Sequence, residues 1–297
     1  MAWPKIGLMP RCYLLDIAAG RMDLLEWLEA AVGLGPEGHE LHEAFFRGKP
    51  PRYVAEVRRR AESLGVPVVS LCFAPDFTKP DPTERSAEVE RQRRAIRLAA
   101  ELGAGLCRTL SGQRRDGLER EEAIAWVVEC IERSLPEAER CGVVLVIENH
   151  YKDAFWEYPE FAQKAEVFLR IVERIRSPHF GVQFDPSNAI LAGEDPLELL
   201  QRVKHRLVAM HASDRYLESG ASLEDLRCAD GTIGYSPKLR HGEIGKGLND
   251  YEAIFAVLRE IEFDGWITVE DGETMASMGN SVRFLKAMRQ RYFGGER

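Results

Sequence analysis

Short apolar segments recur along the chain, and longer segments with an apolar residue at every third or fourth position separate them. Uninterrupted apolar segments are typical of parallel strands buried on both faces, and the longer spacing is typical of helices with one apolar side. The strand-like segments number eight and cover residues 5–10, 38–46, 66–73, 105–110, 143–150, 180–185, 207–214 and 266–271. Clear helical stripes cover residues 54–64, 124–135, 161–172 and 254–261.

Eight strand–helix alternations in 297 residues predict an α/β fold, the (β/α)8 TIM barrel, in a single domain over residues 1–297. A doubly wound open sheet is the alternative, and it would place a glycine-rich phosphate-binding turn after an early strand. The glycine-rich segment 242–247 comes late with no predicted strand before it, so we expect a turn. Residues 151–159 and 216–247 form long connections after strands, and we expect lids or binding loops there.

The composition fits an ordinary globular protein, with 45% hydrophobic and 30% charged residues. The net charge of −8 and a pI near 5.6 argue against nucleic acid or an anionic membrane as partner. Apolar runs are too short for a membrane span, and the first residues lack the pattern of a signal peptide, so a cytoplasmic location is expected. The six cysteines are scattered without a CxxC pair, as expected for reduced, buried thiols.

Ionisable residues follow four of the apolar segments at corresponding positions: Glu148, Asp185, His211 and Glu270 are the first such residues after the fifth to eighth strands. In a barrel these four side chains face the same mouth. Three carboxylates there repel one another unless a cation lies among them. Any one of them alone could be an ordinary strand-end ion pair or cap. Together they predict one divalent ion, Mn²⁺ first, with Mg²⁺, Co²⁺, Fe²⁺ or Zn²⁺ as alternatives.

Five segments carry a resemblance to a known family: ENH at the fifth strand, FDPSN at the sixth, MHASDR at the seventh, the later HGEIGKG, and VED at the eighth. In this order they resemble the xylose isomerase-like TIM-barrel superfamily over essentially the whole chain. That group contains sugar isomerases and epimerases and also apurinic endonucleases. The resemblance implies a TIM barrel and, for a ketose 3-epimerase-like member, a small-molecule sugar substrate.

The ketose 3-epimerase branch also implies roles for individual residues. The positions matching Glu148, Asp185, His211 and Glu270 hold one divalent metal in that branch, and the two glutamates also act as acid and base. Arg215 matches an arginine that contacts substrate oxygen there.

Two positions depart from the pattern. Asn188 stands where the epimerases and endonucleases usually have a histidine, and Leu239 stands where the endonucleases have an aspartate, whereas His241 is retained. A trinuclear zinc cluster would therefore lack two ligands, and together with the negative charge this argues against an endonuclease. Asn188 and His241 are kept as substrate-binding candidates.

The predicted activity is that of a metal-dependent sugar isomerase or epimerase, which moves a proton on a keto sugar through a metal-stabilised enediolate. His150, two residues after Glu148, keeps an alternative open, because a histidine base beside a metal-bound ketone also suits a lyase. Dehydratases and 3-oxo-glycoside deglycosidases of the same superfamily are the examples. A non-catalytic sugar-binding barrel is the third hypothesis.

Further residues near the strand ends are substrate-binding candidates. Trp156 could stack on a sugar face, and Glu40 and His42 could contact its hydroxyls, with Arg108 and Arg11 as weaker candidates. The sequence contains no clear phosphate-binding loop, so we expect an unphosphorylated sugar. Composition leaves homo-oligomerisation open.

Overall fold

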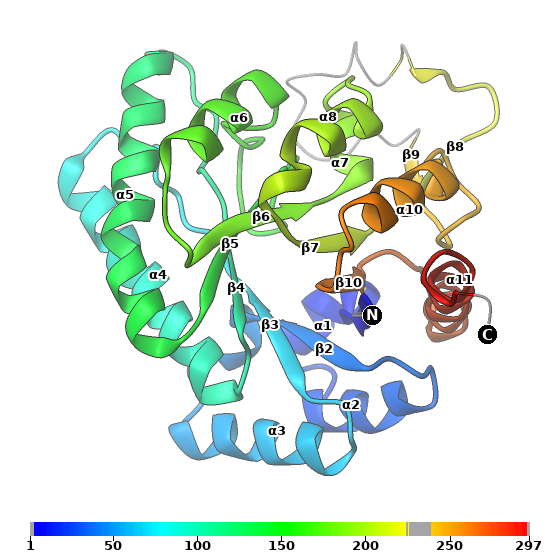
Figure 1. The fold of residues 1–297 in the computed structure, drawn as a ribbon. Coiled ribbons are helices and arrows are strands. Elements are labelled where there is room, and N and C mark those ends of the chain that lie inside the picture. Colours follow the sequence, from blue (N-terminus) through cyan, green and yellow to red (C-terminus); the bar gives the residue numbers. More distant parts are fainter. Residues whose placement is uncertain (1–2, 224, 226–238, 296–297) are drawn as a thin grey trace.

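Eight parallel strands close into a barrel in the computed structural model, which describes residues 3–223, 225 and 239–295 (Figure 1). Neighbouring strands follow the chain order, and β1 pairs with β10, which closes the circle and excludes the open sheet. The TIM-barrel prediction is therefore confirmed, and all eight predicted segments contain a strand. The strands are β1 (Lys5–Leu8), β2 (Gly38–His42), β3 (Val68–Cys72), β4 (Leu106–Thr109), β5 (Val144–Glu148), β6 (Phe180–Phe184), β7 (Leu207–Ala212) and β10 (Trp266–Val269).

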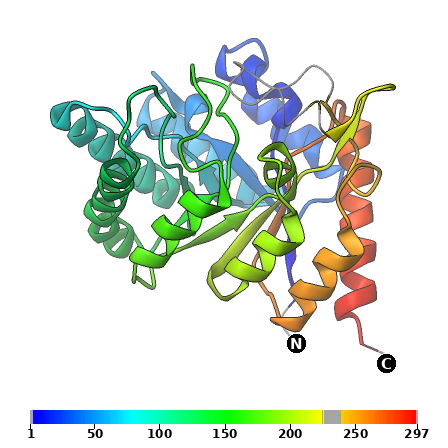
Figure 2. The same cartoon turned by 90° about the horizontal axis from the view of Figure 1, so that it is seen from above.

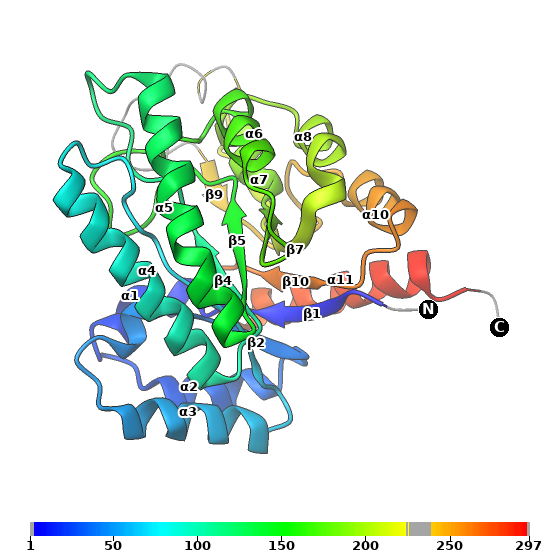
Figure 3. The same ribbon diagram turned by 60° about the vertical axis from the view of Figure 1, so that its left-hand side comes forward.

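Helices surround the strands and bury the apolar sides that the sequence predicts (Figure 1). Figure 2 shows the two longest, α4 and α5, side by side. Figure 3 shows α11 beside β1, so that the last helix covers the strand that begins the barrel. The helices are α1 (Leu14–Ala18), α2 (Leu24–Val32), α3 (Pro51–Ser63), α4 (Pro82–Leu102), α5 (Arg120–Cys141), α6 (Ala165–Arg174), α7 (Pro186–Leu191), α8 (Pro196–Val203), α10 (Tyr251–Glu260) and α11 (Met275–Phe293).

Several boundaries differ from the predicted ones. The second predicted strand ends at His42, because the imidazole Nδ1 accepts the N–H of Ala44 and the chain turns into the short 3₁₀ helix η2 (Glu43–Phe46). The stripe that begins at Phe161 enters its helix only at Ala165, after Lys164. At the start of this helix, the N–H of Ala165 donates to the Glu194 carboxylate at 3.0 Å, whereas Lys164 makes no side-chain cap.

The two ends of the long connection 216–247 pair as an antiparallel ribbon of β8 (Arg215–Leu217) and β9 (Leu239–His241). A strand therefore directly precedes residues 242–247, contrary to expectation, although the segment itself is a turn as predicted. The Asp214 carboxylate holds this turn by accepting the N–H groups of Gly245 and Gly247, each at 2.9 Å. Residues 224 and 226–238 of the predicted loop lie outside the described residues.

The barrel interior changes character along its axis. An apolar cluster of Leu106, Val146 and Ala209 fills one end. Two residues further along the same strands, the interior side chains are Arg108, Glu148 and His211, all buried. The polar layer therefore lies towards the carboxyl ends of the strands, the face where TIM barrels bind their ligands.

Two composition-based expectations can be compared with the described residues. None of the described helices has the length and apolar character needed to cross a membrane. The five described cysteines form no disulfide, in keeping with reduced thiols, and Cys228 lies outside the described residues.

Candidate metal centre and active site

Four ionisable side chains converge at the carboxyl ends of neighbouring strands. Glu148 ends β5, Asp185 follows β6, His211 lies in β7 and Glu270 follows β10. One ligand atom from each lies within 4.8 Å of the others, and all four residues are buried. The structure thus brings together the ligand set that the sequence predicts, from strands that are adjacent in the barrel.

Asp185 has one satisfied and one unsatisfied carboxylate oxygen. Its Oδ1 accepts the N–H of Asn188 at 2.9 Å and the hydroxyl of Ser213 at 2.7 Å, at the start of α7. Its Oδ2 is buried and has no hydrogen-bond partner among the described residues. Burial raises the pKa of Asp185 well above its ordinary value, and the charges of Glu270 and Glu148 raise it further. A buried anionic oxygen held among like charges is the environment that a cation relieves.

The two ring nitrogens of His211 have different partners. Nε2 lies 3.0 Å from Oε1 of Glu40, whereas Nδ1 lies 3.1 Å from Oε1 of Glu148 and 3.3 Å from Oε2 of Glu270. If Nε2 donates its hydrogen to Glu40, the Nδ1 lone pair faces the predicted ligands. Burial lowers the pKa of His211, but Glu270, Glu40 and Glu148 together raise it well above its ordinary value. The site therefore attracts positive charge, and its donor set fits a divalent cation.

Glu40 lies inside the barrel on the far side of His211 from this ligand set. It also accepts from Cys72 Sγ at 2.8 Å and Gln183 Nε2 at 3.2 Å. Glu40, Cys72 and His211 form a second set of donors within metal-binding reach. Burial raises the pKa of Cys72, so the thiol keeps its hydrogen and donates it to Glu40. We therefore interpret this second set as holding the imidazole of His211 in position. A substrate contact by Glu40 stays a prediction.

Arg108 connects the ligand set to the loop after β5. Its guanidinium is buried and donates through Nη1 to Glu148 Oε2 at 2.9 Å and through Nη2 to Asp153 Oδ2 at 3.1 Å. His42 lies on the other side of Asp153, with 3.7 Å between Nε2 and Oδ2. Sequence reasoning ranked Arg108 low and missed Asp153. A lone arginine inside the apolar fourth strand was the available signal, because a buried charge needs a partner.

Asn188 and His150 lie at the same mouth. Asn188 donates from Nδ2 to Glu148 Oε1 at 3.2 Å, so it holds a ligand oxygen in place. His150 is buried, with its Nδ1 3.3 Å from Glu160 Oε2 and its ring edge-on to Trp156 at 6.5 Å between centroids. Burial lowers the pKa of His150, but Glu148 and Glu160 outweigh it and the pKa is raised.

Arg215 and His241 meet beside Glu270 on the ribbon. They are paired positions of β8 and β9, and both reach Asp271, Arg215 with 3.7 Å from Nε to Oδ2 and His241 through Nδ1 and Oδ1. Arg11 begins the short 3₁₀ helix η1 (Arg11–Tyr13) that follows β1. Burial raises the pKa of Glu270, but the charges of His211 and Arg11 lower it well below its ordinary value. These basic side chains border the candidate site without belonging to its ligand set.

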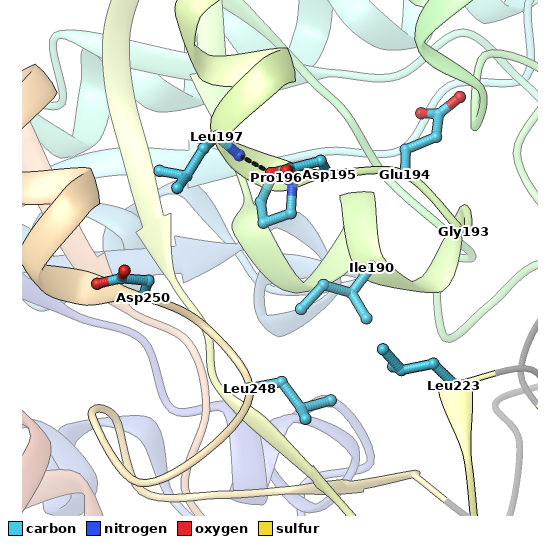
Figure 4. Close-up of a pocket in the computed structure, with 9 residues that line it drawn as sticks. All are labelled: Ile190, Gly193, Glu194, Asp195, Pro196, Leu197, Leu223, Leu248 and Asp250. Carbon is cyan, nitrogen blue, oxygen red and sulfur yellow. Dashed lines mark hydrogen bonds between the residues drawn. The ribbon is translucent and has the colours of Figure 1, made fainter.

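A separate pocket of about 350 Å³ lies where α7, α8 and the segment before α10 meet (Figure 4). Ile190, Leu197 and Leu248 contribute its apolar wall, and Asp195 caps α8 because its carboxylate accepts the N–H of Leu197. None of the four ligand candidates lines this pocket. The candidate metal ligands and the pocket of Figure 4 therefore lie in different parts of the fold.

Comparison with known proteins agrees with the fold. Residues 28–288 match the family described as the xylose isomerase-like TIM barrel. The chain belongs to this family. The resemblance expected from the motifs is thus confirmed.

Two relatives are named as a dehydratase and a decarboxylase. The chain is 27% identical to inosose dehydratase of Clostridium botulinum over 110 residues, which are 36% of this chain and 35% of the relative. It is 25% identical to 3-oxo-isoapionate decarboxylase of Pectobacterium atrosepticum over 214 residues, 71% of this chain and 64% of the relative. The matches therefore span less than two thirds of each relative's length.

A solved structure extends the likeness to the whole chain. L-ribulose 3-epimerase superposes with a TM-score of 0.75 at 16% identity, over 97% of this chain and 95% of that one. At this identity the likeness concerns the fold alone. The proteins that this chain resembles are thus named as an epimerase, a dehydratase and a decarboxylase.

Proposed function

We propose that this protein is a divalent-metal-dependent enzyme that isomerises or epimerises a keto sugar by proton transfer beside the carbonyl. The observation that carries the proposal is the buried convergence of Glu148, Asp185, His211 and Glu270, with the unsatisfied Oδ2 of Asp185 among them. The whole-chain likeness to an epimerase structure is in keeping with it.

These four residues would hold the metal. When bound, a divalent ion polarises a carbonyl oxygen and thereby acidifies the hydrogen on the neighbouring carbon. Glu148 is fixed by Arg108 and Asn188, while Glu270 is the more exposed of the two glutamates, with 11% of its side chain exposed against 0%. Glu270 is therefore the freer of the two to accept or return a proton.

The outcome depends on where the proton returns. Return to the same carbon from the opposite face gives an epimer, and return to the next carbon moves the carbonyl. Glu148 and Glu270 come from β5 and β10, with β6 and β7 between them, so they approach the mouth from different sides. This placement suits one carboxylate on each face of the substrate.

A lyase is the second candidate, and one contact favours it. The 3.3 Å approach of Glu160 to His150 resembles the carboxylate–histidine pairs in which the acid orients a histidine base. Such a base would remove the proton on the carbon beside the carbonyl while a hydroxyl or glycosyloxy group leaves the next carbon with its bonding electrons, so that a double bond forms between the two carbons. The names of the two curated relatives support this candidate.

Incubation of keto sugars in D₂O with Mn²⁺ tests the proposal. After removal of the metal, NMR should show deuterium at the carbon beside the carbonyl and an intact carbon skeleton. Formation of an enone, or release of an aglycone from a keto-glycoside, would instead establish the lyase. Binding of metal and sugar without any exchange would establish a non-catalytic sugar-binding barrel. Glu270→Gln provides the control, because its amide cannot accept the proton.

A further inference from the structure

A second concave region lies beside the candidate metal centre, at the carboxyl ends of β2 to β5. It has a volume of about 250 Å³. His42 from β2, Asp76 from the loop after β3, Gln113 from the loop after β4 and Trp156 from the loop after β5 line it. We call it the distal pocket. Because it opens on the same face of the barrel as the ligand set, one substrate can reach both.

The guanidinium of Arg108 links the distal pocket to the candidate metal centre. Asp153 lines the pocket and accepts Nη2 of Arg108 at 3.1 Å, while Nη1 of the same arginine donates to Glu148 at 2.9 Å. A molecule whose reacting carbon lies at Glu148 would therefore extend its other end towards Asp153.

The charges of the distal pocket balance. Lys79 and Arg91 both pair with Oε1 of Glu88, at 3.1 Å and 2.9 Å. Arg47 pairs with Glu43 at 3.0 Å, just outside the pocket. A phosphate-binding pocket needs an excess of positive charge, whereas equal numbers of acids and bases suit a neutral, hydroxyl-rich ligand. The charged lining residues are Arg47, Lys79, Arg91, Asp76, Glu88 and Asp153.

An unused hydrogen-bond donor points to a ligand. Nδ1 of His42 accepts the N–H of Ala44 at 3.1 Å, so the ring hydrogen lies on Nε2. Nε2 is buried, has no hydrogen-bond partner among the described residues, and lies 3.7 Å from Asp153 Oδ2, beyond hydrogen-bond distance. A ligand hydroxyl that lies beside both atoms would accept from His42 Nε2 and donate to Asp153 Oδ2.

Aromatic rings complete the distal pocket. Phe155 is 42% exposed, with its ring 5.5 Å from that of His42 and 4.9 Å from the guanidinium of Arg47. Trp156 follows it in the lining. Aromatic faces beside paired hydrogen-bonding groups match a sugar ring, which has apolar C–H faces and a polar rim.

We propose that the distal pocket binds a second sugar ring, so that the substrate is a glycosylated keto sugar and not a free monosaccharide. Pockets for larger ligands measure roughly 300–1,000 Å³, so this smaller volume suits one ring. The identity of the reacting end rests on the proposed function, but occupancy of the distal pocket is measurable by binding alone.

Isothermal titration calorimetry of the Mn²⁺-supplied protein tests the proposal. The probes are D-fructose and four glucosyl-fructoses, turanose, maltulose, leucrose and isomaltulose, which carry the second ring on different hydroxyls. At least one disaccharide should bind about tenfold more tightly than D-fructose. Phe155→Ala should remove most of this advantage. Tyr158→Ala, which removes a 38% exposed aromatic ring of the same loop outside the pocket lining, should retain it.

Three results would overturn the proposal. The first is that no disaccharide binds more tightly than D-fructose, and the second is that the advantage survives Phe155→Ala. The third is that D-fructose 6-phosphate or inorganic phosphate binds more tightly than every disaccharide and depends on Phe155. A disaccharide preference without deuterium exchange would support the distal pocket while contradicting the proposed reaction, so the two failures are distinguishable.

Discussion

Nε2 of His211 lies 3.0 Å from Oε1 of Glu40, although the two residues are 171 positions apart. Glu40 belongs to β2 and His211 to β7, so the contact crosses the inside of the barrel. Burial raises the pKa of Glu40, but His211 outweighs it and the pKa falls to about 2. An ionised Glu40 holds the hydrogen on Nε2, which leaves Nδ1 directed at the candidate ligands.

Glu40→Ala should therefore weaken Mn²⁺ binding by about 10–100-fold, because the imidazole loses the partner that sets its orientation and tautomer. Glu40→Gln keeps an acceptor oxygen and should lose less. Calorimetric titration of metal-free protein with Mn²⁺ measures both, and circular dichroism verifies folding. A folded Glu40→Ala protein with wild-type affinity would contradict this role.

Asp185→Asn should separate metal binding from folding. Loss of a ligand charge should lower Mn²⁺ affinity by at least about 100-fold. The metal-free variant should be as stable as wild type or more stable by about 1–2 kcal/mol, because a buried carboxylate oxygen without a partner is removed. Urea unfolding with a chelator measures this. Mn²⁺ should then raise the Tm of wild type only. Strong destabilisation of the metal-free variant would show that the charge is structural.

Arg108→Met should destabilise the protein by about 3–5 kcal/mol, because it leaves Glu148 and Asp153 buried without their cation. Adding Asp153→Asn should restore part of that loss. Arg94→Met on the exposed side of α4 is the control, with an expected change within about 0.5 kcal/mol. Urea unfolding midpoints compare the three variants with wild type. An Arg108→Met protein as stable as the control would refute a structural role for the buried arginine.

His150→Ala distinguishes the two enzymatic candidates. If the glutamates transfer the protons, as we expect, turnover should fall by about 10–100-fold, since His150 then only positions its neighbours. If His150 is the base of a lyase, the loss should be about 10²–10⁴-fold. Initial rates at saturating Mn²⁺ give the answer, with Glu160→Gln measured in parallel. A near-complete loss at unchanged metal content would favour the lyase.

The Asp76 carboxylate should contribute to the fall in the free energy of unfolding at acid pH. Burial raises its pKa, but Arg115 and the N–H of Gln113 outweigh burial and lower it. The stabilisation is therefore complete above the unfolded-state pKa of about 4 and is lost as pH falls through the lower folded pKa.

Asp76→Asn should accordingly cost about 1–3 kcal/mol at pH 7, and the difference from wild type should shrink below about pH 4. Urea unfolding at a series of pH values measures this. The exposed Asp264→Asn is the control. A difference that stays constant down to pH 2 would contradict the lowered pKa.

Much of the arrangement of the candidate site could be predicted, because it follows from the pattern of apolar and ionisable residues along each strand. Each apolar segment is long enough to form one strand of the barrel wall, and the first ionisable residue after it lies near the carboxyl end of that strand. Glu148, Asp185, His211 and Glu270 were found in this way, and the structure places them together. Their role as ligands stays a prediction.

Other residues gave no such signal. Asp153 lies in a loop, where an acidic residue is usually solvent-exposed, and its burial against Arg108 and His42 depends on how that loop folds back. The sequence places Glu40 near the end of its strand, as a substrate-binding candidate. Its contact with His211 arises only inside the closed barrel, so no local pattern predicts it. The ribbon that brings Arg215 and His241 to Asp271 has strands of three residues each, too short to leave a periodic pattern.

The sequence by itself determined the barrel and the strand ends, because periodicity and burial act over neighbouring residues. Only the tertiary structure decided which side chains meet, because closure of the barrel joins residues far apart in the chain. Arg108 reaches Asp153 across 45 positions and His211 reaches Glu148 across 63. In the buried interior each charge must find a partner, and that requirement, rather than any local pattern, fixed the hydrogen-bond network around the candidate metal centre.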